Sequence, residues 1–291
     1  MAIAEALGGT VINADSAQVY ADLRLLSARP SDADEARVPH RLFGHVGANE
    51  PYSAARWAKE ATVAIDEAHA EGSLPILVGG TGLYLRTLLD GIAPVPDINS
   101  AVRVDVRAMV VTEAYQHLQR LDPGAAARLA PADTTRVARA LEVILSTGRT
   151  LVQWQAERVG GIGARITLMP LILLPDRDWL ITRCDARLAA MFDAGVDAEI
   201  AALLALPNVP DNAPVLRAIG VREVAGWLDR THDRATALAQ AQLATRRYAK
   251  RQYTWFRNQP PEDWPRTSEQ TTDRLVATFR SLYSSSSVVQ P

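Results

Sequence analysis

The chain has 291 residues, of which 48% are hydrophobic and 22% charged, and its formal net charge is −2. This composition is ordinary for a globular protein and excludes a global basic field, so any nucleic-acid contact needs a local basic patch. The single cysteine, Cys184, excludes a disulfide framework within the chain and a cysteine-rich zinc site, which suits a reducing cytoplasm. The longest apolar run, Ile166 to Leu174, is too short to span a bilayer. We therefore expect a cytoplasmic protein that is not embedded in a membrane.

The first residues predict a helix end followed by a strand. Residues 1–7 are helical in pattern, and Gly8-Gly9 is a C-cap signal. Seven residues are too few for an independent helix, so the segment looks like a helix whose front is absent. Thr10, Val11 and Ile12 then predict a strand over 10–14.

A polar stretch follows this strand and contains Asp15, Ser16, Ala17 and Gln18. In open α/β sheets, ligands bind outside the carboxyl ends of the strands. Asp15 is therefore a candidate general base, and Gln18 a candidate reader of a planar polar substrate. The alternative is structural, with Asp15 and Ser16 capping the next turn.

Residues 21–52 are expected to be irregular, because they are charged and interrupted by prolines. His40 and His45 are too few for a metal site without carboxylate partners, so we expect both to be structural. The pattern of residues 53–71 predicts an amphipathic helix. Its apolar stripe is Trp57, Ala61, Ala64, Ile65 and Ala68.

A second strand, 75–78, is predicted to be buried and leads directly into Gly79-Gly80-Thr81-Gly82. A helix over 83–91 follows. A strand, a glycine turn and a helix N-terminus together can form an anion-binding concavity, in which the Thr81 hydroxyl could reach a phosphate. The turn matches neither common glycine-rich fingerprint, and the chain contains no Gly-Lys pair. A tight turn with a purely structural role is the alternative.

Residues 98–157 are almost entirely helical in pattern and predict a helical insertion. The core face of one of its helices is predicted to contain Val137, Leu141, Ile144 and Leu145, with Arg136 and Arg139 on another face. The glycine-rich segment 160–163 is the expected hinge back to a strand over 166–174.

More helices are predicted after Pro175. The first has Ile181, Cys184, Leu188 and Met191 as its apolar stripe, with Arg183 and Arg187 on its polar side. Helices over 195–205 and 213–228 follow.

The segment Thr245–Arg257 contains five cations and no acid. In a helix the cations fall within an arc of roughly 140°, while Tyr248, Trp255 and Phe256 project mostly to the other side. A solvated surface helix normally interleaves glutamates for i,i+4 pairing. Their absence favours a polyanionic partner such as nucleic acid, with a plain surface helix as the alternative. The cations are Arg246, Arg247, Lys250, Arg251 and Arg257.

Taken in order, these motifs resemble those of the tRNA dimethylallyltransferases, also called tRNA isopentenyltransferases. The similarity runs from about residue 1 to about residue 264. The main blocks are Asp15-Ser16-Ala17-Gln18-Val19-Tyr20, Ser27-Ala28-Arg29-Pro30, Gly79-Gly80-Thr81-Gly82-Leu83-Tyr84, Arg136-Val137-Ala138-Arg139-Ala140-Leu141-Glu142 and Lys250-Arg251-Gln252-Tyr253-Thr254-Trp255-Phe256.

The resemblance implies an α/β fold with a P-loop-type parallel sheet core flanked by helices, together with a helical insertion domain. It assigns residues 1–95 and 164–265 to the core and 96–163 to the insertion. Residues 266–291 are left as a C-terminal tail, disordered in part and ending in a low-complexity serine run at 284–287. We expect a monomer.

The implied reaction moves a dimethylallyl group from dimethylallyl diphosphate to the N6 amine of an adenine beside the tRNA anticodon, assisted by Mg²⁺. Asp15 would orient the amine and accept its proton. Ser16 and Gln18 would contact the flipped base. Thr81 would lie where amine and diphosphate meet, and Arg187 would neutralise charge on the diphosphate.

The resemblance also implies an extended surface for the tRNA anticodon stem-loop. The strand-end residues Asp15, Ser16, Ala17 and Gln18 belong to it. The remaining matched positions are Arg103, Thr135, Arg136, Arg139, Arg217, Arg222, Lys250, Arg251, Gln252 and Arg257.

The chain departs from the family pattern most clearly at its start. Family members begin with a strand and a P-loop ending in Gly-Lys-Ser/Thr, whereas this sequence starts in the helix that should follow. We expect the recorded start to lie downstream of the true one, and we expect unpaired edges on the strands next to the absent one. Smaller departures are Val221, where the family often has Tyr, and Leu26-Ser27, where it usually has Gly-Thr.

Three alternatives to the tRNA prenyltransferase remain. A non-catalytic RNA-binding homologue would follow from loss of the P-loop. An adenine-nucleotide prenyltransferase of the same fold would act on free AMP or ADP, although a small nucleotide needs no extended basic surface. A P-loop kinase is disfavoured because no Walker lysine is present.

Overall fold

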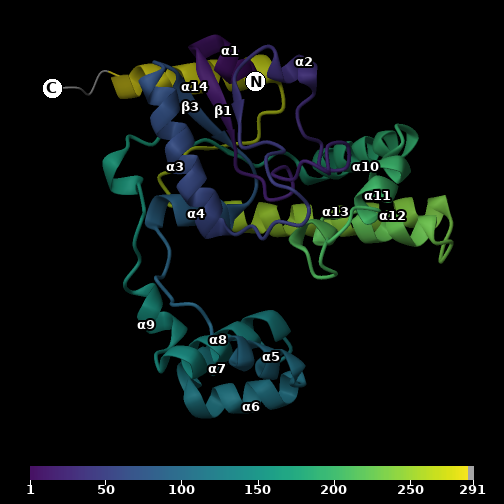
Figure 1. Ribbon diagram of the computed structural model, residues 1–291. Helices are drawn as coiled ribbons and strands as arrows, with labels where there is room; N and C mark the ends of the chain where they lie inside the picture. Colours follow the sequence, from purple (N-terminus) through teal and green to yellow (C-terminus); the bar gives the residue numbers. More distant parts are fainter. Residues whose placement is uncertain (288–291) are drawn as a thin grey trace. The chain divides into compact units, whose positions relative to one another are not determined.

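The computed structural model describes residues 1–287 of the chain (Figure 1). The chain divides into two compact units, one formed by Met1–Arg86 with Ile166–Pro291 and the other by Thr87–Arg165. The second unit contains the whole segment 96–163 that the sequence assigns to a helical insertion. Within residues 1–287, no helix combines the length and apolarity needed to cross a membrane.

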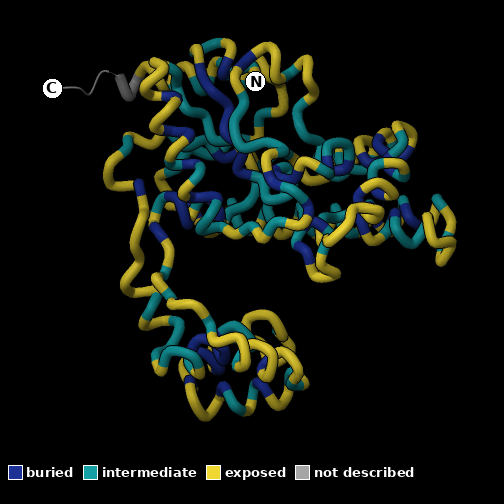
Figure 2. Tube along the Cα trace, viewed as in Figure 1, coloured by how far each residue is buried: buried dark blue, intermediate teal, exposed yellow. Residues whose placement is uncertain are grey.

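Strand β1 (Gly9–Asn13) is the centre of the first unit. It lies parallel to β2 (His40–Arg41) on one side and to β3 (Leu74–Val78) on the other. Val11 is paired with both His40 and Ile76. All five residues of β1 are buried, as expected for the middle strand of a parallel sheet (Figure 2).

The helices predicted for the N-terminal part of the chain are present. Helix α1 (Ala2–Leu7) ends at Gly8, whose φ of 66° is a left-handed C-cap. Helix α3 (Ala54–Ala70) begins at the N-cap Ser53 and buries the predicted stripe of Trp57, Ala61, Ala64, Ile65 and Ala68. Helix α4 (Gly82–Asp90) follows the glycine turn. In the region expected to be irregular, a short α2 (Asp32–Glu35) is capped by Ser31.

The prediction that the second strand is buried is wrong. Strand β3 is only partly buried, and its last residue, Val78, is 49% exposed. The reason is its position, since β3 ends the three-stranded sheet and among residues 1–287 only β1 pairs with it.

The predicted strand 166–174 is also too long. Only β4 (Ile172–Leu173) forms, and it pairs in parallel with β5 (Arg266–Thr267) in a separate two-stranded sheet. Pro170 cannot donate to a ladder, which limits the strand on its N-terminal side. The described strands therefore make two small parallel sheets in place of one continuous sheet.

The C-terminal segment is part of the fold up to residue 287, so the prediction of a tail from residue 266 is wrong there. Strand β5 pairs with β4, and helix α14 (Thr272–Ser287) packs against α1. The serine run 284–287 lies within this helix. The predicted disorder otherwise falls on residues 288–291, which lie outside the described residues.

Four α-helices lie between β4 and β5 in the first unit: α10 (Arg177–Asp193), α11 (Val196–Leu204), α12 (Val221–Leu228) and the long α13 (Arg234–Asn258). A short 3-10 helix, η2 (Pro214–Arg217), precedes α12. Helix α13 packs against α10 and α12 through small buried residues, Ala237 and Ala241, that allow close approach.

The second unit is helical. Its helices are α5 (Ser100–Ala108), α6 (Val111–Leu121), α7 (Pro123–Arg128), α8 (Thr134–Thr147) and α9 (Leu151–Gln155), followed by η1 (Gly163–Arg165). Val137 and Leu141 are in its core as predicted, and Ile144 packs against that core. Leu145 is 45% exposed and was wrongly placed in the core, because α8 turns Ala140 and Val143 inward instead.

Candidate active site

The end of β1 is fixed by Asn13, which is fully buried. Its Oδ1 accepts the N–H of Asp15 at 2.8 Å, and its Nδ2 donates to the carbonyl oxygens of Asp15 and Leu42 at 3.0 Å each. The Nε1 of Trp57 donates to the backbone oxygen of Asn13 at 2.8 Å. These four hydrogen bonds hold the backbone on which the Asp15 carboxylate is mounted.

Asp15 uses one of its carboxylate oxygens locally. Its Oδ1 accepts the N–H of Ala17 at 2.8 Å, so the capping interaction foreseen as the alternative is present. The same carboxylate lines a cavity of about 210 Å³, where its second oxygen can accept a hydrogen bond from a ligand. Capping and a functional role are therefore compatible in this geometry.

Thr81 is brought to Asp15 through Ser16. Its Oγ1 accepts the N–H of Ser16 at 3.0 Å and donates to the Ser16 hydroxyl at 3.3 Å. The N–H of Thr81 donates to the carbonyl oxygen of Ala14 at 3.2 Å. Residues after the carboxyl ends of β1 and β3 thus meet, and Thr81 is hydrogen-bonded to Ser16, the residue next to Asp15.

The glycine turn is shaped by close packing. A Cβ at Gly79 would overlap the backbone of Ala14, one at Gly80 would overlap the side chain of Gln252, and one at Gly82 would overlap the indole of Trp255. Gln252 also donates to the carbonyl oxygen of Gly80 at 3.0 Å. The turn is therefore packed against the end of β1 on one side and against α13 on the other, which supports a structural role for its glycines.

The cavity beside Asp15 gathers several of the predicted site residues in the first unit. Ser16, Ala17, Arg187 and Arg217 line it together with Asp15. Its other walls are mainly apolar, from Leu26, Leu188, Met191 and Ile219. The result is a small pocket with a carboxylate, hydroxyls and guanidinium groups at its polar side, which is the usual composition of a site for a polar ring system.

Tyr248 is a cavity residue to which the sequence analysis assigned no site role. It lines the pocket from α13, and its hydroxyl interacts with the side chains of Thr81 and Gln252. Burial raises the pKa of this phenol, and the negative charge of Asp15 raises it further. Tyr248 therefore stays protonated and neutral beside Asp15. Its position one helical turn before Gln252 was a signal available in the sequence.

Gln18 does not line the cavity. Its Nε2 donates to the carbonyl oxygens of Ser27 and Ala28, at 3.0 and 2.9 Å. Both hydrogens of the amide are thereby used within the chain. Gln18 was predicted to bind the substrate, but in the structure its side chain binds the loop that forms one wall of the cavity.

The cations of α13 are exposed, and its aromatic residues Tyr248, Trp255 and Phe256 are half-buried, as the helical pattern predicts. Arg246 is neutralised by an ion pair with Asp185 of α10. Arg247, Lys250, Arg251 and Arg257 remain on the surface, with Arg251 over the Tyr248 ring at 5.4 Å. Arg222 is exposed at the start of α12.

The second unit contains its own basic cluster. Burial lowers the pKa of Arg139, and the neighbouring charges of Arg103 and Arg107 lower it further, against the opposing effect of Glu142. Glu142 is fully buried and accepts from Arg107 at 2.7 Å. Thr135 and Arg136 are exposed at the start of α8, where Asp133 pairs with Arg136 at 3.6 Å. The predicted RNA-binding arginines of this unit thus share one surface region of α5 and α8.

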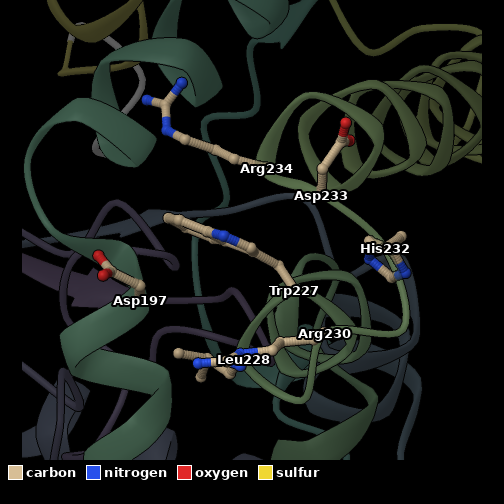
Figure 3. A pocket seen from close by; sticks show the side chains of 7 residues that line it. All are labelled: Asp197, Trp227, Leu228, Arg230, His232, Asp233 and Arg234. Atoms are coloured by element: carbon tan, nitrogen blue, oxygen red, sulfur yellow. The ribbon is translucent and has the colours of Figure 1, made fainter.

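A second, larger hollow of about 580 Å³ lies beside Trp227 (Figure 3). The side chains of His232, Asp233 and Arg234 in this hollow make contacts within the fold, whereas Asp197 and Arg230 also line it. Arg234 pairs with Asp193 and lies near the Trp227 ring, His232 contacts the carbonyl oxygen of Glu223 at 2.8 Å, and Asp233 caps α13.

Polar groups that follow the carboxyl ends of parallel strands and line a cavity are the arrangement of an α/β enzyme. Residues 18–259 match the family model described as IPP transferase. The chain belongs to the IPP transferase family.

Curated relatives agree with this assignment. The chain is 62% identical to the tRNA dimethylallyltransferase of Sphingopyxis alaskensis, over 95% of this chain and 90% of that protein. It is 52% identical to the tRNA dimethylallyltransferase of Zymomonas mobilis, over 88% of this chain and 82% of that protein.

Solved structures show the same fold. The full-length tRNA isopentenylpyrophosphate transferase of Bacillus halodurans is 29% identical with a TM-score of 0.68, covering 97% of this chain and 89% of that chain. A eukaryotic dimethylallyltransferase acting on tRNA is 29% identical with a TM-score of 0.72, covering 87% of this chain and 65% of that chain. The α/β fold predicted from the motifs is confirmed.

Proposed function

We propose that this protein transfers a dimethylallyl group from dimethylallyl diphosphate to N6 of the adenine 3′-adjacent to the anticodon in tRNA. The observation that carries the proposal is that Asp15 and Ser16 line the cavity, while Thr81 is hydrogen-bonded to Ser16. Family membership and the names of the relatives support the same reaction.

The chemistry follows from the position of Asp15. The N6 amine of adenine is a weak nucleophile, and a fixed carboxylate both aligns it and takes its proton. As the N6–C1 bond to the dimethylallyl group forms, the C1–O bond to diphosphate breaks and diphosphate leaves with the electron pair. One N6 proton passes to Asp15. The pocket volume of about 210 Å³ suits a base that has left its stack.

Charge on the leaving diphosphate needs neutralisation. Arg187 and Arg217 line the cavity and are the cations available there. The Thr81 hydroxyl donates to Ser16, so it would give up that hydrogen bond to donate to a phosphate oxygen. The resemblance implies Mg²⁺, and within residues 1–287 no three His, Cys, Asp or Glu side chains are grouped so that they could hold a metal ion. No step above depends on it. Mg²⁺ usually binds through substrate phosphates with one or two carboxylates, so we propose that it accompanies the diphosphate.

The tRNA surface in this proposal is the exposed basic face of α13, together with Arg217, Arg222 and the arginine cluster of the second unit. Exposed guanidinium and ammonium groups suit phosphate contacts that set register without reading sequence. We also propose that the protein acts as a monomer and is located in the cytoplasm.

The test is prenyl transfer by the purified protein to a tRNA transcript with adenine next to the anticodon, and to a matched transcript with guanine there. We expect transfer to the first only. D15N should lower kcat by about 10²- to 10⁴-fold with the tRNA Kd unchanged, because it removes the proton acceptor and keeps the shape.

The matched control is D22N. Asp22 also accepts a backbone N–H, from Ala48 at 2.9 Å, but it does not line the cavity. Its kcat should equal that of the wild type. Binding of tRNA without transfer would contradict the proposal in favour of the non-catalytic homologue, and transfer to AMP in preference to tRNA would favour a nucleotide prenyltransferase.

A further inference from the structure

The loop Leu23–Arg29 forms one wall of the Asp15 cavity, through Leu26 and Ser27. Its backbone is strained, since Ala28 has a φ of 54°, which residues with a Cβ rarely adopt. Such conformations persist only where the surroundings over-determine them, and they cluster at functional sites. The contacts that hold this loop therefore bear on the shape of the site.

Glu199 of α11 holds the loop through three successive backbone amides. Its Oε1 accepts the N–H groups of Arg24 and Leu25 at 2.6 Å each, and its Oε2 accepts the N–H of Leu26 at 2.8 Å. Consecutive amides that point to one place make a concavity for an anion, and here a half-buried carboxylate from a distant part of the chain fills it. Hydrogen bonds to an ionised acceptor are about twice as strong as neutral ones.

The other side of the loop is held by Gln18, whose amide donates to the carbonyl oxygens of Ser27 and Ala28. Between these two anchors, Leu26 lies directly over Gly220, where a Cβ would come within 2.6 Å of its side chain. Gly220 follows the segment Arg217–Ile219, which lines the same cavity. The loop is therefore fixed by Gln18, by Glu199 and by the contact of Leu26 with Gly220.

We infer that Glu199 is a positioning residue, which holds the strained loop Leu23–Arg29 in the conformation that forms the adenine-binding wall of the cavity. Glu199 does not itself line the cavity, so it acts through the loop. The inference deepens the proposed function and rests on it.

The test compares E199Q with E269Q. Glu269 is a matched control, because its Oε1 also accepts two successive backbone amides, those of Gln270 and Thr271, at 2.8 and 2.9 Å, in a segment that does not line the cavity. The side-chain amide in E199Q keeps one acceptor but turns a donor toward the loop amides. If about one molecule in ten then keeps the competent loop, the apparent Kd for tRNA rises about tenfold.

We expect E199Q to raise the Kd and KM for tRNA about tenfold, with the KM for dimethylallyl diphosphate unchanged. E269Q should leave all three constants at wild-type values. Folded E199Q with wild-type tRNA constants would overturn the inference, because a residue with only a stabilising role lowers Tm and does not shift KM for one substrate alone.

E199D provides the second variant if E199Q does not fold. Its carboxylate is one carbon shorter, so we expect a smaller rise in the tRNA Kd in the same direction, and wild-type affinity would again contradict the role. Failure of the proposed function has a different signature, because the wild-type protein itself would then show no transfer to tRNA.

Discussion

The side-chain amide of Gln252 donates to the carbonyl oxygen of Gly80 at 3.0 Å, which joins α13 to the glycine turn that precedes α4. The same side chain interacts with the hydroxyl of Tyr248. The resemblance assigns Gln252 to RNA contact, but its amide nitrogen is directed toward the turn next to Thr81. The basic face of α13 and the Thr81 turn are thus parts of one packed assembly.

Replacement of this amide should affect catalysis more than binding. Q252E keeps the size of the side chain but removes the donor, and it places a carboxylate against a carbonyl oxygen. An unsatisfied group of this kind costs about 1–3 kcal/mol, so we expect kcat to fall by about tenfold. The Kd for tRNA should stay within about twofold of wild type, because the hydrogen bond that is lost lies within the protein, between Gln252 and Gly80. Single-turnover transfer and filter binding measure the two quantities.

The control for Gln252 is K250Q, on the exposed face of the same helix. It should weaken tRNA binding and leave single-turnover transfer at saturating tRNA unchanged. If Q252E weakens binding while kcat stays constant, Gln252 contacts RNA and the positioning role is wrong.

Neutralising an exposed cation of α13 should change the salt dependence of tRNA binding. For each RNA phosphate that the variant no longer neutralises, the slope of log K against log salt should fall by about 0.7 to 0.9. We expect this result for K250Q and R257Q. R246Q should change the slope less, because Arg246 is already paired with Asp185. Titrations at several salt concentrations decide this, and wild-type slopes in K250Q and R257Q would contradict a phosphate-binding face.

Much of the fold could be predicted because the sequence signals were local. The cap at Gly8, the stripe of α3 and the cations of α13 depend on neighbours within a few turns, and periodicity shows them directly. The division into two sheets could not be predicted in this way. It depends on which strands pair, and β4 finds its partner in β5, about ninety residues later in the chain.

The candidate site shows the same limit. Asp15 and Thr81 were predicted because each follows a strand, at the position where α/β sheets present ligands. Glu199 has no local signal, since a glutamate in a helix is ordinary, and only tertiary packing brings it to the amides of residues 24–26. Gln18 was assigned by motif to substrate, and its actual partners are carbonyl oxygens of a loop that the motif does not describe.

The buried Asn13 should be essential for stability. N13A removes a side chain that satisfies the N–H and carbonyl of Asp15 and the carbonyl of Leu42 in a fully buried position. We expect the free energy of unfolding to fall by about 3 kcal/mol, because unsatisfied buried groups cost about 1–3 kcal/mol each. Urea denaturation measures this loss.

The matched control is N99A, in the second unit. Asn99 also accepts backbone N–H groups, from Ala101 and Val102, but it is an exposed N-cap of α5. N99A should lower the free energy of unfolding by only about 1 kcal/mol. Equal decreases in the free energy of unfolding for N13A and N99A would show that the Asn13 hydrogen bonds do not stabilise the end of β1.

Glu269 should give the stability of the first unit a measurable acid dependence. Hydrogen bonds from the backbone and hydroxyl of Thr271 and from the backbone of Gln270 lower its pKa from 4.5 to about 2. Because the folded-state pKa is depressed, the stabilisation is fully present above the unfolded value of 4.5, decreases as pH falls between 4.5 and 2, and is absent below about 2.

E269Q cannot titrate at this position. The difference in Tm between wild type and E269Q should therefore be largest at neutral pH and shrink as pH falls through this range, as followed by circular dichroism. E262Q is the control, since the carboxylate of Glu262 makes no hydrogen bond or ion pair within residues 1–287, and its Tm at neutral pH should differ little from that of the wild type. A constant difference for E269Q across the range would contradict the shifted pKa.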